Sequence, residues 1–448
     1  MEMSNYQLSI NNYQLPKGYK QTEVGVIPED WELKRLIEVV DYVDYRGKTP
    51  PKQESGIILV TARNIRDGFI DYESSQEYVS EAEYDKIMRR GKPEIGDVLI
   101  TTEAPLGNVA AVDNRNIALA QRVIKYRAKN KKLNQEYLKY YLLSKKFQRI
   151  LQDNSSGSTA QGIKGSLLHT LPIIIATEKE QRAIATTLSD VDALIAALDK
   201  LIAKQRHLKT ATMQQLLTGK KRLPRRMDNG ELIIDNDGNP VMFGPSMDNC
   251  QLSIDNYQLP KGYKQTEVGV IPEDWEVKKL GQVLQIRHGR TQHEVVDSNG
   301  IYPILATGGE IGRTNTPLYS EPSVLIGRKG TIDIPYYMDT PFWTVDTLFY
   351  SEISKDADPK FIFYKFNLID WYSYNEASGV PSLNAATIES IDQAFPPSIE
   401  EQCAIATVLS DMDAAIAALE NRRAKTQAIK QGMMQELLTG KTRLINNE

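Results

Sequence analysis

The chain has 448 residues, a net charge of −4 and the composition of an ordinary globular protein. No apolar run approaches the roughly 20 residues that a membrane span needs, and the N-terminus lacks the basic and apolar regions of a secretory signal. The only two cysteines, Cys250 and Cys403, exclude a disulfide framework and a cysteine-rich zinc site. These features predict a cytoplasmic protein of about three structural units.

Basic residues are concentrated in two places despite the acidic total. One group lies between residues 122 and 132, and the other lies between residues 220 and 226. Local patches rather than net charge set the attraction to phosphate, so either group could contact nucleic acid. A solvated surface is the commoner role for each group taken alone.

A block of sequence near the N-terminus occurs twice. Residues 5–36 return as residues 249–280 with four differences, at an offset of 244. The polar start of the block is typical of a tail or linker, so residues 1–24 are predicted to be an N-terminal tail. The first domain is expected to begin at Gly25.

Residues 25–176 are predicted to form a mixed α/β domain. Short β-rich runs alternate with Gly- and Asp-containing turns, and apolar residues at helical spacing predict a helix over 135–151. The predicted strands are 57–61, 97–102, 108–112 and 122–127.

The stretch 177–220 contains the start, body and end of one long helix. Thr177 followed by Glu180 is the pattern of a capping box, and Gly219 stands where a helix-ending glycine belongs. Apolar residues at alternating steps of four and three predict a coiled-coil seam, not the broader stripe of a helix lying on a sheet. The seam comprises Ile184, Leu188, Val191, Ile195, Leu198 and Ile202.

The same helix recurs over 398–443, at an offset of 221. Ser398 and Glu401 rebuild the capping box, and Gly440 rebuilds the end. Two matching seams in one chain most simply bury each other, so the two helices are predicted to pair. The second seam comprises Ile405, Leu409, Met412, Ile416 and Leu419.

The rest of the second half follows the plan of the first. Residues 221–268 are predicted to be linker and repeat block, residues 269–397 a second mixed α/β domain, and residues 444–448 a tail. The second domain shares the order of the first but not its residues. Its predicted elements are strands at 324–327 and 344–350 and a helix over 359–372. The fold class is therefore α+β, with two mixed α/β domains separated by two long helices in a pseudo-two-fold internal repeat.

This duplicated order resembles the specificity subunit of type I restriction–modification systems over nearly the whole chain. The motifs are E-Q-[RC]-A-I-A followed by L-S-D-x-D at both helix starts and L-L-T-G-K at both helix ends. E-V-G-V-I-P-E-D-W opens each half, and GDVLIT (96–101) and LIGRKGTI (325–332) support the resemblance.

The resemblance implies that each mixed domain is a target-recognition domain that reads one half of a bipartite, asymmetric site on double-stranded DNA. The helices would pair as an antiparallel coiled coil, set the spacing of the domains and dock two copies of a modification subunit. Restriction subunits would add translocation and cleavage. S-adenosylmethionine, ATP and Mg would belong to these partner subunits, with no cofactor in this chain and no membrane involved.

Catalysis by the chain itself is not expected. It lacks the N-P-P-[FY] loop of adenine methyltransferases, and Gly440-Lys441-Thr442 follows a helix where a phosphate loop must precede one. The acidic run at 273–278 has no separated carboxylate to complete a metal pair. The four histidines lack metal-ligand spacing, so no metal site is predicted.

Base reading needs Arg, Lys, Asn or Gln on loops that can enter a DNA groove. About a third of the candidates are expected to contact DNA, the others being phosphate contacts, turn formers or plain surface. The candidates in the first domain are Arg46, Lys48, Arg63, Asn64, Gln121, Arg122, Thr159 and Gln161. Those in the second domain are Arg287, His288, Arg290, Gln292, Arg313, Arg328, Lys329 and Asn384.

Two other functional hypotheses remain open at this point. A structural coiled-coil adaptor would use its β-rich domains to bind proteins, and would show no DNA affinity and no dependence of binding on salt. A stand-alone methyltransferase or nuclease is disfavoured by the missing catalytic loops.

Overall fold

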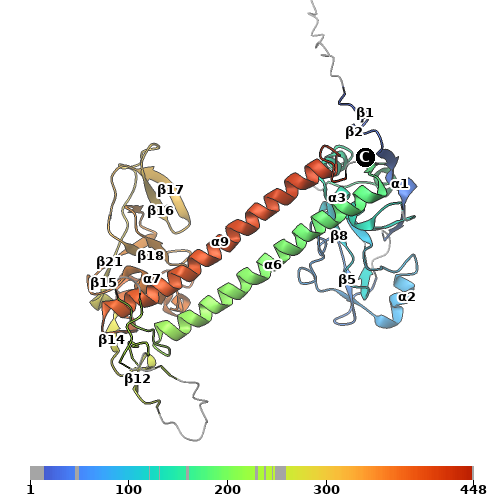
Figure 1. Ribbon diagram of the computed structural model, residues 1–448. Coiled ribbons are helices and arrows are strands. Elements are labelled where there is room, and N and C mark those ends of the chain that lie inside the picture. Colours follow the sequence, from blue (N-terminus) through green and yellow to red (C-terminus); the bar gives the residue numbers. More distant parts are fainter. Residues whose placement is uncertain are drawn as a thin grey trace, which may run out of the picture. The chain divides into compact units, whose positions relative to one another are not determined.

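The computed structural model describes residues 15–45, 50–120, 122–130, 132–157, 161–227, 231–236, 239–244, 246–247 and 259–445. The chain forms two compact units, one comprising Met1–Asp199 with Asn421–Glu448 and the other Lys200–Glu420. The division falls inside both long helices, α6 (Glu178–Leu217) and α9 (Ile399–Leu437), so each unit contains part of each helix (Figure 1).

The described part of the first unit contains two larger sheets. A four-stranded antiparallel sheet has the order β4-β10-β7-β8, and a three-stranded sheet has the order β6-β5-β9. All residues of β7 are buried because alternate side chains enter different cores, with Ile100 in one and Leu99 in the other. The four predicted strands are confirmed within two residues. The bounds are β4 (Val40–Asp44), β5 (Ile57–Val60), β6 (Tyr78–Val79), β7 (Val98–Thr102), β8 (Leu106–Ala111), β9 (Ile117–Leu119) and β10 (Val123–Ala128).

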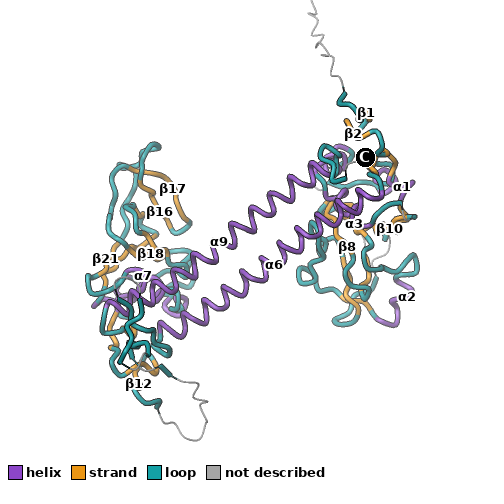
Figure 2. The backbone as a smooth tube through the Cα atoms, in the orientation of Figure 1, coloured by secondary structure: helices purple, strands orange, loops and turns teal. Residues whose placement is uncertain are grey.

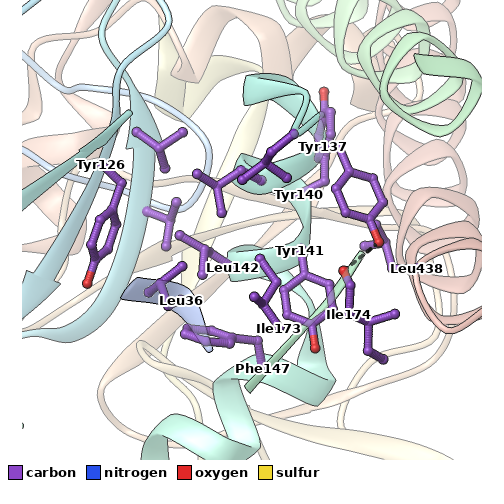
Figure 3. Packing of buried hydrophobic residues seen from close by; sticks show 14 of the residues in the cluster. Leu36, Tyr126, Tyr137, Tyr140, Tyr141, Leu142, Phe147, Ile173, Ile174 and Leu438 are labelled. Atoms are coloured by element: carbon purple, nitrogen blue, oxygen red, sulfur yellow. Dashed lines mark hydrogen bonds between the residues drawn. The ribbon is translucent and has the colours of Figure 1, made fainter. Parts of the chain in front are cut away.

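The single helix predicted over 135–151 is wrong, because two helices, α3 (Gln135–Leu143) and α4 (Lys145–Asp153), occupy that stretch. Ser144 between them is extended, and its hydroxyl accepts a hydrogen bond from the Phe147 amide. Serine competes for backbone groups in this way and so favours a cap over a helix interior. Buried side chains of α3 and α4 fill the core shown in Figure 3, where the Tyr137 hydroxyl donates to the Ile174 carbonyl at 3.0 Å.

Ordered structure begins earlier than predicted. β1 (Tyr19–Thr22) pairs with β2 (Gly25–Pro28), so part of the segment predicted to be a tail is a strand. β3 (Glu32–Arg35) pairs with β11 (Pro172–Ile175), which leads into α6. The remaining helices of the described first unit are short: α1 (Leu36–Val39), α2 (Tyr84–Ile87), α5 (Gly165–Leu168) and the 3-10 turn Glu81–Glu83.

The second unit repeats this plan. Its sheets have the orders β15-β21-β18-β19, β17-β16-β20, β12-β13 and β14-β22. The strand predicted over 344–350 is two strands separated by a turn, and the helix predicted over 359–372 ends at Phe366. The strand bounds are β12 (Tyr263–Thr266), β13 (Gly269–Pro272), β14 (Glu276–Lys279), β15 (Leu284–Arg287), β16 (Tyr302–Ala306), β17 (Gly309–Thr314), β18 (Ser323–Gly327), β19 (Tyr336–Met338), β20 (Trp343–Thr344), β21 (Leu348–Ile353) and β22 (Asp392–Phe395). The helices are α7 (Pro359–Phe366), α8 (Ala385–Glu389) and the 3-10 turns Leu280–Gln282 and Trp371–Tyr374.

The long helices pair antiparallel in both units, as predicted. In the first unit Asp192 pairs with Lys430 and Asp199 with Arg423, each at 2.5 Å. Residue numbers rise along α6 as they fall along α9, which defines the antiparallel direction. In the second unit the Lys209 ammonium contacts Asp413 at 2.5 Å, again with the helices antiparallel. The backbone tube in Figure 2 shows α6 and α9 as the two long helices.

The seam is wider than predicted at the start of each helix. Ile184 and Leu188 lie in the core of the first domain together with Ala185. Ile405 and Leu409 lie in the second core together with Ala406. The first turns therefore pack as a broad stripe on their domains, whereas a narrow seam holds further along. There Leu198, Ile202 and Ile416 are buried, and Val191, Ile195, Met412 and Leu419 are half-buried.

The segment predicted to be a linker is partly ordered by its own backbone. The amide of Arg225 donates to the Val241 carbonyl, that of Val241 donates to Ile233, and that of Ile233 donates to Arg225. β12 also lies within the residues predicted to be linker and repeat block.

Among the described residues, α9 is the one helix that is long and apolar enough to cross a membrane by length and composition alone. The same helix carries the ion pairs to α6 and contributes Ile405 and Leu409 to the second core.

A buried lysine on α7 makes the stability of the second unit depend on pH. The Lys365 ammonium donates to the Leu217 carbonyl at 2.8 Å, and 3% of the residue is exposed. Burial lowers the pKa of Lys365 to about 7 from 10.5. Between these two values the unfolded chain binds more protons than the folded chain, so stability rises with pH across that window.

We expect Lys365→Met to be more stable than the parent by a few kcal/mol at pH 7 and below, and this advantage to shrink toward pH 10. Urea unfolding between pH 6.5 and 9.5 measures the difference, with Lys355→Met as the exposed control. A difference between parent and Lys365→Met that is the same at every pH would contradict the burial of a titrating ammonium.

Candidate nucleic-acid interface

Several loops of the first domain converge where the strands of its four-stranded sheet end. The backbone amide of Thr102, at the end of β7, donates to the Arg122 carbonyl at 2.9 Å, just before β10 begins. The amide of Ile163 donates to the Thr102 carbonyl at 3.0 Å, which ties the loop before α5 to the same place. The loop after β5 joins them, because β5 and β9 are parallel and end together. We define the first loop edge as residues 61–64, 103–105, 122 and 161–163.

The second domain has the same scheme of backbone hydrogen bonds. The amide of Arg328, following β18, donates to the Thr347 carbonyl at 2.9 Å, and the amide of Leu383 donates to the Arg328 carbonyl at 2.9 Å. Arg328 therefore occupies the position of Thr102, and Thr347 that of Arg122. We define the second loop edge as residues 288–292, 328–330, 345–347 and 380–384.

The loop after β15 is held tightly at the second loop edge. The amide of Arg290 donates to the Thr344 carbonyl at 2.8 Å, and the Trp343 indole donates to the Arg290 carbonyl at 2.9 Å. A Cβ atom on Gly289 would lie 2.2 Å from the Val345 carbonyl oxygen, so only glycine fits. A close backbone approach, rather than turn geometry, explains this glycine.

Charged side chains at these edges are paired and at least partly exposed. Arg122 pairs with Glu103 at 3.6 Å, and Arg328 pairs with Asp346 at 2.5 Å. Beside the second edge, the hydrogen bond that Arg287 donates to the Glu352 carboxylate raises the pKa of Arg287. Exposed pairs of this kind contribute roughly 0–1 kcal/mol to stability, so they can be exchanged for another charged partner.

Backbone strain is concentrated at the first loop edge. Within the described residues, two non-glycine residues have positive φ, Ala104 at 44° and Arg122 at 68°. The left-handed conformation costs an L-residue about 1–2 kcal/mol, and such residues cluster at functional sites.

Most of the predicted DNA-reading residues that the structure describes lie at or beside the two edges. These are Arg63, Asn64, Arg122 and Gln161 at the first, and Arg287, His288, Arg290, Gln292, Arg328, Lys329 and Asn384 at the second. Arg46, Lys48, Gln121 and Thr159 lie outside the described residues. Arg313 lies elsewhere, because it pairs with Pro303 at the far end of the β16–β17 hairpin.

Two of the candidates serve the fold. Asn64 is fully buried; its side-chain carbonyl accepts from Thr61, and its amide donates to the carbonyls of Asp71 and Ser75. Asn384 caps α8 by accepting from the Ala386 amide. A hydrogen bond from the Asn64 side chain to a base would therefore require this loop to open.

The basic groups seen in the sequence are each divided between the inside of the protein and its surface. Lys125 and Arg127 both pair with Asp97, at 3.1 and 2.6 Å. Burial raises the pKa of the Asp97 carboxyl. The hydrogen bonds that Arg127 donates outweigh this effect and bring the pKa of Asp97 below its ordinary value. Arg222, from the second group, is 1% exposed. Each group nevertheless keeps part of the solvated surface that the sequence suggested. Its exposed members are Arg122, Lys129 and Lys132 in the first group and Lys220, Lys221, Arg225 and Arg226 in the second.

A duplicated arginine network, which the sequence pattern did not predict, joins each helix end to a domain. Arg443, after α9, contacts Glu180 at 2.9 Å and Asp30 at 2.8 Å, and its guanidinium lies 5.7 Å from the Trp31 ring. The Trp31 indole donates to Glu180 at 2.7 Å. The predicted capping box is therefore half confirmed: the Thr177 hydroxyl accepts from the Glu180 amide, but the Glu180 carboxylate binds this network.

The second unit contains the equivalent network. Arg222, after α6, contacts Glu401 at 2.5 Å and Asp274 at 2.8 Å, with its guanidinium 5.7 Å from the Trp275 ring. Gly219 has a φ of 71°, and a Cβ on it would lie 2.6 Å from Pro272. The repeated block and the repeated helix end are therefore two sides of one contact. In the sequence this contact is visible only as the recurrence of the block at an offset of 244 and of the helix end at an offset of 221.

Removing either arginine should be strongly destabilising. Arg443→Ala leaves the buried Glu180 carboxylate without its main charge partner, which costs about 3–5 kcal/mol for a buried pair. Arg222→Ala should have the same effect on the second unit. Thermal unfolding measures both, with the exposed neighbours Lys441→Ala and Lys221→Ala as matched controls. Unfolding temperatures equal to those of the controls would mean that these pairs do not hold the helix ends.

Comparisons with known proteins agree with this architecture. The family model for the type I restriction modification DNA specificity domain matches residues 28–205 and 272–431, more than half of the chain. The chain is 26% identical to the MjaX specificity subunit of Methanocaldococcus jannaschii, over 96% of this chain and 97% of the relative. It is 24% identical to the MjaVIII specificity subunit of the same organism, over 96% and 97%.

A solved structure with the same fold is the S subunit of a type I restriction–modification system from M. genitalium. Its TM-score is 0.55 at 16% identity, covering 91% of this chain and 96% of that one. The two family-model matches coincide with the two repeats of domain and long helix described above. The chain therefore belongs to the type I restriction–modification DNA specificity family.

Proposed function

We propose that this chain is the specificity subunit of a type I complex and that each loop edge reads one half of a bipartite site on double-stranded DNA. The observation that carries this proposal is the repeated backbone scheme at the two edges. The same hydrogen bonds hold Thr102 to Arg122 and Arg328 to Thr347, while the exposed side chains differ. A constant frame with variable side chains suits two domains that read different base sequences.

The paired helices are proposed to dock two copies of a modification subunit and to set the spacing between half-sites. The cross-helix ion pairs and the buried seam support this role, because they make the pair a stiff element. The modification subunits would bring S-adenosylmethionine, and restriction subunits would bring ATP-dependent translocation and cleavage with Mg. The chain alone would transfer no methyl group, and its place of action would be the cytoplasm.

A coiled-coil adaptor with protein-binding domains is the alternative. It would require no cations at the loop edges, whereas Arg290, Arg328 and Lys329 are gathered at the second one. Arginine recognises guanine through paired hydrogen bonds in the major groove, a chemistry that a protein-binding adaptor does not need.

Exchanging residues 25–176 for the same region of a relative tests the proposal. We expect the methylated sequence in host DNA to change in one half-site and to stay unchanged in the other, because each domain has its own core and its own loop edge. Methylation-sensitive sequencing of the host genome measures this, with a strain lacking the gene and a strain lacking the modification subunit as controls. A change in both halves, or in neither, would contradict independent reading by two domains.

A further inference from the structure

The two exposed arginine–carboxylate pairs bridge equivalent loops with opposite polarity. In the first domain the acid, Glu103, follows the strand β7 and the arginine, Arg122, precedes β10. In the second domain the arginine, Arg328, follows β18 and the acid, Asp346, precedes β21. The hydrogen bonds that equate Thr102 with Arg328 fix the correspondence of the loops, and they place Arg328 one residue before the position of Glu103.

Neither pair is needed to hold its loops together. The backbone bonds between Thr102 and Arg122, and between Arg328 and Thr347, already join the two loops in each domain. About half of the side-chain surface of Arg122 and of Glu103 is exposed, as are 28% of the Arg328 side chain and 67% of the Asp346 side chain, so water screens the attraction. Nevertheless Arg122 stays in the left-handed region at a φ of 68°, which costs free energy that the ion pair does not repay.

The chemistry of such a pair matches one G·C base pair. A guanidinium donates two parallel hydrogen bonds to O6 and N7 of guanine, and a carboxylate accepts from N4 of the paired cytosine. A guanidinium and a carboxylate side by side therefore present one partner to each base of the same pair. An adenine or thymine at that position would leave the guanidinium incompletely bonded.

We propose that Arg122 with Glu103, and Arg328 with Asp346, are specificity-determining residues, each pair recognising one G·C base pair in its half-site. This inference rests on the proposed function. The arginine lies before β10 in the first domain but after β18 in the second. When the two folds are superposed, the domains would therefore take guanine from opposite DNA strands. The difference between half-sites is then partly built into the polarity of these pairs.

Site selection from a randomised duplex pool by the assembled complex tests the proposal. Arg122→Ala should lower the preference for guanine at one position of one half-site by about 5- to 150-fold and leave the other half-site unchanged. Arg328→Ala should do the same in the other half-site. The matched controls are Arg115→Ala and Lys355→Ala, exposed residues at the opposite ends of the same sheets.

A charge exchange gives the sharper result. The double variant E103R/R122E reverses the pair in the first domain and should replace guanine by cytosine at the position that Arg122→Ala relaxes. Arg122→Lys and Arg328→Lys keep the charge but lose the planar fork of two donors, so they should weaken the same preference even if an alanine variant fails to assemble.

The possible outcomes distinguish a failure of the proposed function from a failure of the role of these pairs. A parent complex that selects no bipartite sequence would overturn the proposed function. A parent complex that selects one, while the alanine and lysine variants keep its preference at every position as the controls do, would overturn the role of these pairs alone. Loss of preference across a whole half-site, rather than at one position, would also count against a single G·C contact.

Discussion

Leu188→Lys and Leu409→Lys are each expected to abolish assembly of the complex and to unfold the domain that the leucine supports. Both leucines are fully buried, Leu188 in the first core with Ile184 and Leu438, and Leu409 in the second core. An unpaired ammonium in such a core costs several kcal/mol or must give up its proton. Since folded proteins are stable by only about 5–15 kcal/mol, one such change consumes much of the total.

Matched controls exist on the same helices. Leu208→Lys and Ile429→Lys place the same ammonium at positions that are 51% exposed, so they test hydrophobic-to-lysine exchange without burial. Thermal unfolding and co-purification with the modification subunit measure the effect. A loss of about 4 kcal/mol corresponds to roughly 10 °C or more for units of this size. If the buried variants retained the assembly and unfolding temperature of the controls, the helices would not pack as described.

Recurrence in the sequence is what made the fold predictable. The two offsets, 221 for the helices and 244 for the block, located both long helices and both mixed domains before any contact was known. Strands such as β7 and β18 were predicted because their runs are rich in apolar and β-branched residues. The helix broken at Ser144 was missed, because a single serine decides locally between helix interior and cap.

The roles of individual charged residues were predictable only in part. Glu180 has the spacing of a capping-box glutamate, and only the folded chain brings Trp31 and Arg443 to its carboxylate. Lys125 and Arg127 lie close to Arg122 in the sequence, but both pair with Asp97, and Lys125 is buried while Arg127 is partly exposed. Sequence gives residue types and spacing, whereas availability for DNA depends on partners distant in the chain.

At the loop edges, too, the sequence predicted only part of the candidate site. Arg122 and Arg328 were candidates on composition alone, but their acidic partners were not, because carboxylates near a DNA surface look unfavourable in a residue count. Glu103 and Asp346 become visible only when the register of the strands equates the two sheets. The arginine and the acid lie on opposite loops in the two domains. This difference can be seen only when the two sheets are aligned, and neither half of the sequence shows it by itself.

Lengthening both long helices by seven residues is expected to lengthen the spacer between half-sites without altering either half-site. In the first unit the pairs Asp192–Lys430 and Asp199–Arg423 fix the register, which sets Ile195 opposite Gln427. Duplicating residues 189–195 in α6 and 420–426 in α9 therefore inserts facing heptads and keeps both seams in phase. Four-residue insertions at the same points break the heptad and serve as the control that should fail to assemble.

The expected change follows from helix and duplex geometry. Seven residues add about 10 Å of helix, or roughly three base pairs at about 3.4 Å each. Those base pairs also rotate one half-site by about 100° around the duplex, given 10–10.5 base pairs per turn. Affinity should therefore fall even at the best spacing, since twisting of DNA or protein must absorb the rotation. Site selection by the assembled complex measures the spacer, and an unchanged spacer in a variant that still assembles and methylates would mean that the helices do not set the distance.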